Sequence, residues 1–170
     1  MRAGVDSATD LAVDVGADAL SRISIFGGLR AETLAFLLAR AERVTVAKGE
    51  VFFHEGDPGG ALYILERGRA EVVKNRAATS ARKAKSVHVA EIKTGGCFGE
   101  VSLLAVMPRS ATVAAVEECE ALRLRYTDLH ALYQHDIAEF AILMMNLGRE
   151  VARRLWKADQ MLLDFADSRS

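Results

Sequence analysis

A short stretch of the sequence, residues 98–113, gathers side chains that together could bind a small anion. The candidate residues, in chain order, are Phe98, Gly99, Glu100, Val101, Ser102, Arg109 and Ser110. Gly99 permits a sharp turn into a short helix, and the first backbone N–H groups of a helix have no partner within that helix. Such unpaired donors suit a phosphate group. We therefore predict a phosphate-binding turn at residues 99–102.

Two further residues favour an anion at this turn, and one requires a second kind of group. Arg109 adds a full positive charge and a forked set of donors, and Ser110 can donate from its hydroxyl or its N–H. Glu100 would repel an anion unless it accepts hydrogen bonds from donors on the ligand or on the protein, and a sugar hydroxyl could donate one. The rest of the predicted pocket is apolar and consists of Val89, Ile92 and Phe98. One phosphate beside one hydroxyl is the pattern that a cyclic nucleotide presents.

The stretch closely resembles the phosphate-binding cassette of cyclic nucleotide-binding domains. These domains are found in catabolite-activator regulators, protein kinase A regulatory subunits and nucleotide-gated channels. Residues 53–65 resemble the second and third strands of the family, and residues 68–72 resemble the turn and strand that follow. Residues 19–163 can be laid on the family pattern as a whole.

The resemblance implies a role for each matching residue. Glu100 would hold the ribose 2′-hydroxyl and Arg109 the cyclic phosphate. The supporting contacts carried over are Gly99, Val101, Ser102 and Ser110. The implied ligand is cAMP or cGMP, acting as a regulator, and no metal is expected.

The base of the nucleotide would lie toward the C-terminal helix. Catabolite-activator relatives place hydroxyl side chains there, whereas this sequence has Ala158 and Asp159. A carboxylate can accept both edge donors of guanine but only one amino group of adenine, so Asp159 permits cGMP. Trp156 could stack on the base as a lid, or could simply pack. Both cAMP and cGMP therefore remain candidates for the ligand.

Short β-rich runs dominate residues 44–125, which must position the cassette. They are residues 51–54, 61–65, 70–73, 87–92, 111–116 and 121–124. Glycines separate them where tight turns need a positive φ. Closely spaced strands with such turns are typical of a sandwich or barrel, and we predict an α+β, mainly β fold built on an eight-stranded jelly roll.

Helical patterns flank this region on both sides. Residues 19–27 and 31–43 are expected to form short helices. Residues 126–165 are expected to form a long C-terminal pair, whose second member, from about residue 137 to 165, is broken only at Gly148. The apolar positions of the last segment recur every three or four residues: Val151, Leu155, Ala158, Leu162 and Phe165. That spacing suits a helix that pairs with another helix, which would give a homodimer, but also a helix folded back on its own roll.

The domain boundaries follow from these patterns. Residues 1–18 are expected to form a flexible arm, residues 19–165 the domain, and residues 166–170 a polar tail without a DNA-recognition helix. A basic, alanine-rich stretch at residues 74–85 is interpreted as a hairpin tip of unknown role. Output would then pass to an unidentified effector protein, or to a domain outside a fragment.

Composition excludes several classes of function. The net charge of the 170 residues is −1, so no overall basic field favours direct nucleic-acid binding. No apolar run is long enough to insert in a membrane, and aspartates interrupt the first 25 residues, so a cytoplasmic protein is expected. Cys97 and Cys119 form no metal-binding or disulfide pattern.

Two alternatives to the sensor remain. Glu100 and Arg109 could form an ion pair in a degenerate domain of the same fold that binds no ligand. A cupin-like enzyme would need a metal site, but His54 and His88 stand alone, and no nucleophile has a base beside it. We therefore expect a protein that is not an enzyme.

Overall fold

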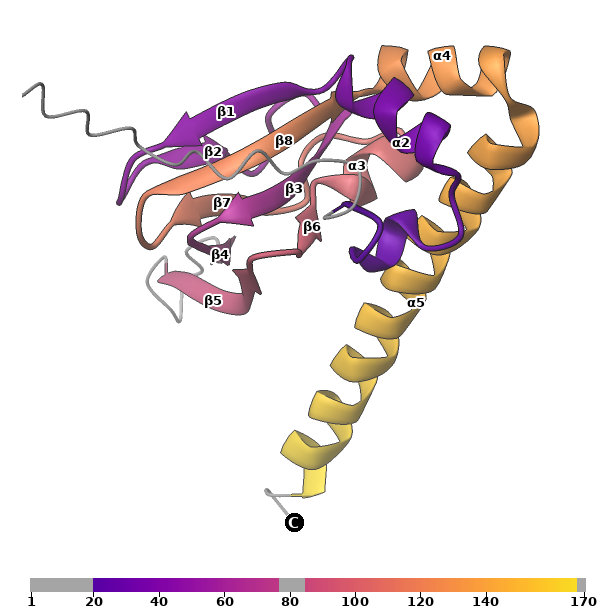
Figure 1. Ribbon diagram of the computed structural model, residues 1–170. Coiled ribbons are helices and arrows are strands. Elements are labelled where there is room, and N and C mark those ends of the chain that lie inside the picture. The colour runs from indigo at the N-terminus through magenta and orange to yellow at the C-terminus, as the bar shows by residue number, and fades with distance from the viewer. Residues whose placement is uncertain (1–19, 77–84, 168–170) are drawn as a thin grey trace, which may run out of the picture.

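The molecule consists of a β-roll with a group of helices packed at one end (Figure 1). The computed structural model describes residues 20–76 and 85–167. Two four-stranded antiparallel sheets form the roll, in the orders β1-β8-β3-β6 and β2-β7-β4-β5. Within the described residues the strands are β1 (Glu42–Val46), β2 (Val51–Phe53), β3 (Ala61–Arg67), β4 (Arg69–Arg76), β5 (Lys85–Lys93), β6 (Cys97–Phe98), β7 (Thr112–Ala115) and β8 (Cys119–Arg125). The predicted eight-stranded, mainly β fold is confirmed.

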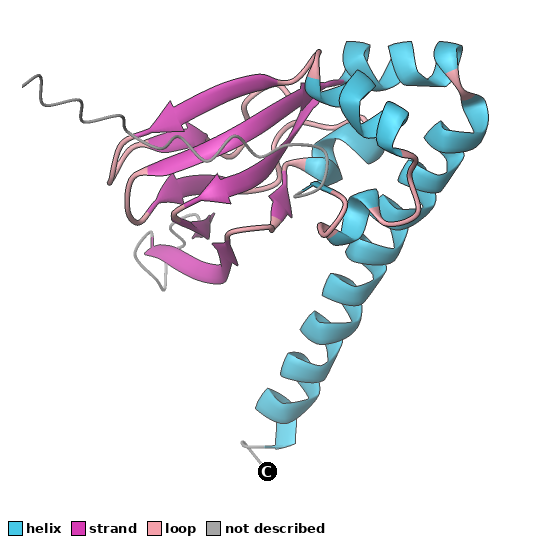
Figure 2. Ribbon diagram, in the orientation of Figure 1, coloured by secondary structure: helices cyan, strands magenta, loops and turns pink. Residues whose placement is uncertain are grey.

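The helices gather at one end of the roll (Figure 2). They are the 3-10 turn η1 (Ser24–Phe26), α2 (Ala31–Leu38), α3 (Glu100–Leu104), α4 (Tyr126–His135) and α5 (Ile137–Asp167). The helix α3 interrupts the roll between β6 and β7, and the others precede or follow it.

The strand β3 packs against the helices on one face and against the interior of the roll on the other. Side chains alternate between the two faces of a strand, and its first five residues are all buried. Leu62 and Ile64 point into a core that they share with the helices, while Ala61, Tyr63 and Leu65 point into the interior of the roll. The strand β3 therefore contributes side chains to both cores.

Several predicted boundaries shift. The helix expected at residues 31–43 ends at Leu38, because β1 begins at Glu42 and pairs with β8 along its whole length. Of the helix expected at residues 19–27, Leu20 is helical and Ser24–Phe26 form the turn η1, while the residues between them form turns.

The expected break at Gly148 is wrong, since α5 runs without interruption through this residue to Asp167. A glycine inside a helix costs about 1 kcal/mol relative to alanine, which the packing of a long helix can offset. The continuous helix that results ends two residues after the predicted end at residue 165.

Three predicted segments fall wholly or partly outside the described residues. The arm at residues 1–18 and the last three residues of the tail are not described. The strands β4 and β5 pair as far as Arg76 and Lys85, so the basic stretch begins and ends in a hairpin whose tip is not described. Among the described residues, no helix is long and apolar enough to cross a membrane.

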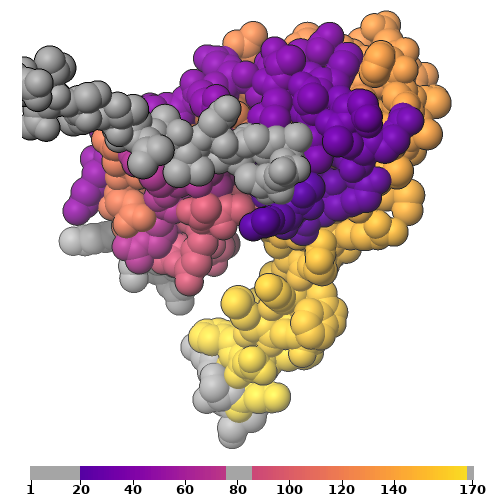
Figure 3. All heavy atoms as spheres, viewed as in Figure 1, coloured from indigo at the N-terminus to yellow at the C-terminus, as the bar shows by residue number. Residues whose placement is uncertain are grey.

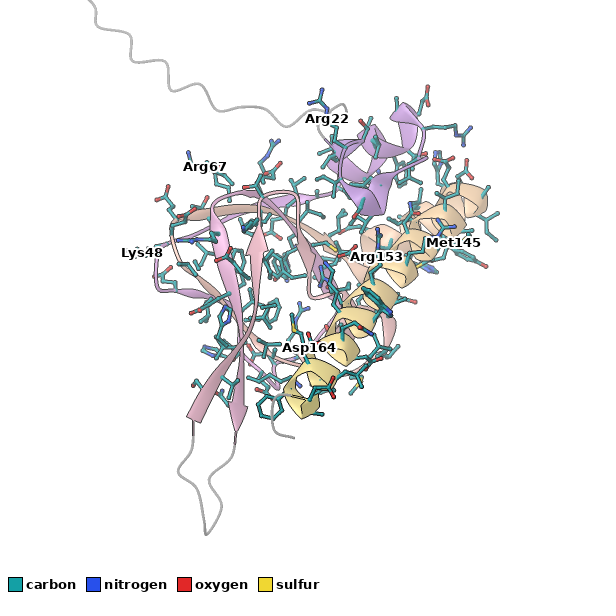
Figure 4. The ribbon with its side chains drawn as sticks, turned by 90° about the horizontal axis from the view of Figure 1, so that it is seen from below. Arg22, Lys48, Arg67, Met145, Arg153 and Asp164 are labelled. Carbon is teal, nitrogen blue, oxygen red and sulfur yellow. The ribbon has the colours of Figure 1, made fainter. Side chains whose placement is uncertain are left out.

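The first half of α5 is fastened to the body, and the second half projects from it (Figure 3). Leu143 and Leu147 are fully buried, and the Asn146 side-chain amide donates to the carbonyls of Ile25 and Gly27 at 3.1 and 2.8 Å. Met145, Arg153 and Asp164, labelled in Figure 4, mark the course of the helix from the body to its far end.

Candidate functional site

The predicted turn into a short helix is present at Gly99. This glycine follows β6 with φ at 80°, and α3 begins at the next residue. A Cβ atom at this position would lie 2.6 Å from Nη1 of Arg109 and 3.0 Å from the carbonyl oxygen of Ala61. The backbone conformation and the close approach of Arg109 therefore both require glycine here.

A small cavity of about 100 Å³ opens beside this turn. Its lining contains seven of the residues that the sequence indicated: Phe98, Gly99, Glu100, Val101, Ser102, Arg109 and Ser110. Five residues were not foreseen as part of it: Phe53, Val72, Ala111, Val113 and Arg154. The cavity is thus lined by residues from β2, β4, β6, α3, β7 and the distant α5.

Arg109 is buried, with 6% of its surface exposed. Its Nη1 donates to the carbonyl oxygens of Ala61 and Gly99 and to Oγ of Ser102, at 2.7, 3.0 and 3.0 Å. The guanidinium also lies over the ring of Phe53, 4.1 Å from its centre. Burial lowers the pKa of Arg109, because the charged form loses its hydration.

One buried donor of Arg109 has no hydrogen-bond partner. Its Nε atom is buried and makes no hydrogen bond to any described residue. An unpaired buried donor costs about 1–3 kcal/mol, and more when it is charged. An anionic oxygen beside Arg109 would remove this cost, so the site fits a phosphate group.

Glu100 is also buried, but an arginine from α5 satisfies it. Nη1 of Arg154 donates to the Glu100 carboxylate at 2.8 Å, and Nη2 of Arg154 donates to the carbonyl oxygen of Cys97 at 2.5 Å. Burial raises the pKa of Glu100, and the positive charge of Arg154 partly opposes this. The helix α5 is therefore tied to the cassette through the residue expected to bind a ribose.

Sequence reasoning missed Arg154, although a signal for it exists. Leu143 and Leu147 form the buried stripe of α5, and Arg154 lies seven residues after Leu147, on the same face of the helix. A charged residue that continues a buried stripe must meet a partner in the body.

The structure does not bring Trp156 and Asp159 to this cavity. Both are exposed, Trp156 to 64%. Each helical residue advances by about 100°, so these side chains lie roughly 200° and 140° around the axis from Arg154, which faces the cassette. They point away from it for this reason.

Val89 also lies outside the cavity. Val89 is 52% exposed and lies at an irregularity in the pairing of β4 with β5, whereas Ile92, three residues later, is buried in the interior of the roll but does not line the cavity either. No group of three or more His, Cys, Asp or Glu side chains in the described residues is placed to hold a metal ion.

The fold and the cassette agree with the chain's similarity to known proteins. The family model described as "Cyclic nucleotide-binding domain" matches residues 43–136. The cyclic AMP receptor protein of Thermus thermophilus is 33% identical over 148 residues, which cover 86% of this chain and 64% of that protein. The chain therefore spans less than two thirds of this relative.

Solved structures show the same architecture. The crystal structure of the Thermus thermophilus catabolite activator protein superposes with a TM-score of 0.71 at 31% identity, over 84% of this chain and 63% of that one. A cyclic nucleotide-binding domain from Methylobacillus flagellatus superposes with a TM-score of 0.76 over 88% of this chain and 81% of that one. At 21% identity, the second likeness shows the fold alone.

Proposed function

Because this chain belongs to the cyclic nucleotide-binding domain family, we propose that it is a regulatory module whose ligand, cAMP or cGMP, binds at residues 99–110 and repositions α5. The proposed role is that of a sensor and not of an enzyme, with a cytoplasmic location. One observation carries the proposal: Arg109, whose buried Nε has no hydrogen-bond partner among the described residues, lines the same cavity as the buried Glu100. A cyclic phosphate would accept from Arg109, and a ribose hydroxyl would donate to Glu100.

The pair formed by Glu100 and Arg154 suggests how binding would reach α5. Nη1 of Arg154 donates a hydrogen bond to the Glu100 carboxylate. A ribose hydroxyl would compete for the same carboxylate, so the ligand prefers a position of α5 in which Arg154 has moved. Such a preference shifts the population between two helix positions.

The size of the cavity supports a required movement. Sites for small molecules usually measure about 300–1,000 Å³, and the cassette cavity measures about 100 Å³. A cyclic nucleotide therefore enters only after the cassette opens, and Arg154 is the side chain that closes it from α5.

The pair formed by Glu100 and Arg154 also favours a second candidate, a domain of this fold that binds no ligand. There the ion pair between Glu100 and Arg154 would be permanent, and α5 would be held in one position. The discriminating property is whether a nucleotide can displace Arg154.

The choice between cAMP and cGMP depends on α5. Trp156 and Asp159 could reach the base only if the helix turns about its axis, and their part in base recognition stays a prediction. Exchange of Asp159 for Ala should change the ratio of the two affinities, and an unchanged ratio would remove Asp159 from the site.

The output surface is the projecting half of α5. Leu155, Leu162 and Phe165 are each at least 60% exposed, and they belong to the apolar stripe that the sequence predicts. We propose that this stripe pairs with a second copy of the chain, and that a further effector protein reads the change in its position.

Thermal unfolding in the presence of cAMP, cGMP and the two non-cyclic 5′-monophosphates tests the proposal. One cyclic nucleotide at about a hundred times its Kd should add about 2.7 kcal/mol, which raises Tm by about 5 to 11 °C. Arg109→Ala should abolish the rise, while Arg67→Ala, at an exposed arginine of β3, should retain it. No rise with either cyclic nucleotide at millimolar concentration would favour the domain that binds no ligand.

A further inference from the structure

A second and larger cavity, of about 430 Å³, shares Arg109 and Phe53 with the cassette cavity and no other residue of its lining. It lies between the loop that joins β2 to β3 and the junction of β8 with α4. The family resemblance assigns it no role, and none of the proposed cassette contacts except Arg109 borders it.

The lining of this cavity is rich in positive charge. Arg109, Arg123 and Arg125 line it, with Asp57 as the one acidic side chain among the lining residues. Nη1 of Arg123 and Nη2 of Arg125 both donate to the same oxygen of Glu42, at 3.3 and 2.5 Å. Two carboxylates therefore face three guanidinium groups, and one positive charge is left without a counterpart.

Two donors on these arginines lack acceptors. Nε of Arg109 and Nε of Arg123 are both buried, and neither has a hydrogen-bond partner among residues 20–76 and 85–167. Since a buried charged donor without an acceptor is costly, two of them on arginines that line one cavity favour a ligand there that accepts hydrogen bonds and carries negative charge. Tyr126, which is 61% exposed, borders the cavity and leaves it accessible from solvent.

We propose that this cavity is a second ligand site, which binds a small oxyanion such as the phosphate group of a metabolite between Arg109 and Arg123. The bound oxyanion accepts hydrogen bonds from the two unpaired Nε atoms and neutralises the surplus charge. Binding involves no covalent change in the ligand or in the protein.

The position of Arg109 couples this site to the cassette, a step that rests on the proposed function. Nη1 of Arg109 already serves three protein oxygens, so Nε and Nη2 are the donors left for ligands. An oxyanion in the second cavity would draw these donors from a cyclic phosphate, and two anions beside one guanidinium repel each other. The two ligands should therefore weaken each other's binding, and to the same extent, as linkage requires.

Direct binding is tested first, with inorganic phosphate as the probe and potassium chloride of equal ionic strength as the reference. Phosphate should raise the Tm of the wild-type chain and of Arg67→Gln, an exposed arginine that borders neither cavity. It should not raise the Tm of Arg123→Gln. Arg123→Lys keeps the charge that faces Glu42 and lacks the Nε donor, so it should show a reduced rise and guards against a folding defect in the glutamine variant.

The identity of the anion is tested with glycerol 3-phosphate at the same concentrations. A larger rise in Tm than with inorganic phosphate assigns the site to a phosphate monoester, and an equal rise assigns it to free phosphate. The absence of any rise with both probes, relative to chloride, would overturn the proposal.

Coupling is tested by titration with the cyclic nucleotide that stabilises the chain. Phosphate near saturation should raise the nucleotide Kd by about fivefold or more in the wild type, and not in Arg123→Gln, whose Kd without phosphate should match the wild-type value. An equal rise in Arg123→Gln would overturn the proposal, because phosphate would then compete at the cassette. The Tm measurements need no nucleotide, so they still test the second site if the proposed function fails.

Discussion

Single residues decide whether the cassette of this protein can hold an anion. Glu100 and Arg109 are buried charges that line one cavity, and each has a hydrogen-bond partner that lies far away in the sequence. Arg109 uses Ala61, from β3, and Glu100 uses Arg154, from α5. Substitutions at these contacts should therefore affect both stability and ligand binding, although the contacting residues lie far apart in the sequence.

Gly99→Ala should impair both stability and ligand binding. The residue would carry a left-handed φ and place its Cβ 2.6 Å from Arg109 Nη1. A loss of about 1–3 kcal/mol in the free energy of unfolding is expected. Gly56→Ala is the matched control, because Gly56 has a similar φ of 89° with open space around its Cβ position. Urea unfolding of both variants isolates the cost of the close approach, and equal losses would contradict it.

Arg154→Gln should destabilise the chain in a manner that depends on pH. Burial raises the pKa of Glu100 above its ordinary value of 4.5, and loss of Arg154 should raise it further. A carboxyl whose pKa is raised in the folded state contributes stability below its unfolded pKa, and this contribution is lost as the pH rises through the folded value. The free energy of unfolding of the variant should therefore be about 1–2 kcal/mol lower than that of the wild type at pH 8, and the difference should be smaller at pH 5. The loss is limited in size because Arg154 is 41% exposed.

The control for this variant is Arg153→Gln. Arg153 is 58% exposed and pairs with Glu150 along the same helix, so its loss should change the unfolding free energy by less than about 0.5 kcal/mol. Chemical unfolding at the two pH values measures both variants. A loss for Arg154→Gln that is the same at pH 5 and pH 8 would show that Glu100 does not carry the effect.

Among the elements, α5 has the central place, because its two halves have different roles. Its first half is a structural part of the core, fastened by Leu143, Asn146 and Leu147. Its start is tied to the segment before α2, since Glu139 accepts hydrogen bonds from the backbone N–H and from Nε of Arg30 at 2.9 and 3.2 Å. The second half meets the body at Arg154 and then leaves it, which suits an element that transmits a change.

Glu139→Gln should weaken the anchored end of α5 at neutral pH. Burial alone would raise the pKa of Glu139, but hydrogen bonds from the Arg30 N–H and the Thr33 side chain and the charge of Arg30 hold it below its usual value of 4.5. A carboxyl with a lowered pKa contributes stability above its unfolded pKa, and the contribution is lost as the pH falls through the folded value. The Tm difference from wild type should be largest near pH 7 and shrink below about pH 4. A difference that grows in acid would refute this account.

For the whole molecule, the open question is what the exposed apolar stripe of α5 contacts. Such a surface on a projecting helix is unusual for a chain that acts alone, and the spacing of Leu155, Ala158 and Leu162 suits a helix pair. The far part of α5, after Arg154, projects from the body, so a second copy could approach it without contact with the roll (Figure 1).

Leu162→Asp should convert a dimer to a monomer. A carboxylate at the centre of an apolar helix seam would lose its hydration without gaining a partner. Light scattering after gel filtration measures the mass, and Lys157→Asp, at an exposed position outside the seam, should stay dimeric. A wild-type chain that is monomeric at all concentrations would assign the stripe to a different protein.

The sequence by itself determined the roll and the cassette turn, because both depend on local rules. Alternation and glycine turns predict strands, and Gly99 followed by Glu100 and Ser102 predicts a helix start whose N–H groups are free. Only the tertiary structure decided which residue of α5 meets this turn. Arg154 and Glu100 are 54 residues apart, and the angular position of each side chain around α5 is set by the burial of Leu143 and Leu147 against the body. That burial directs Arg154 toward the cassette and turns Trp156 and Asp159 away, which no local pattern in residues 156–159 could indicate.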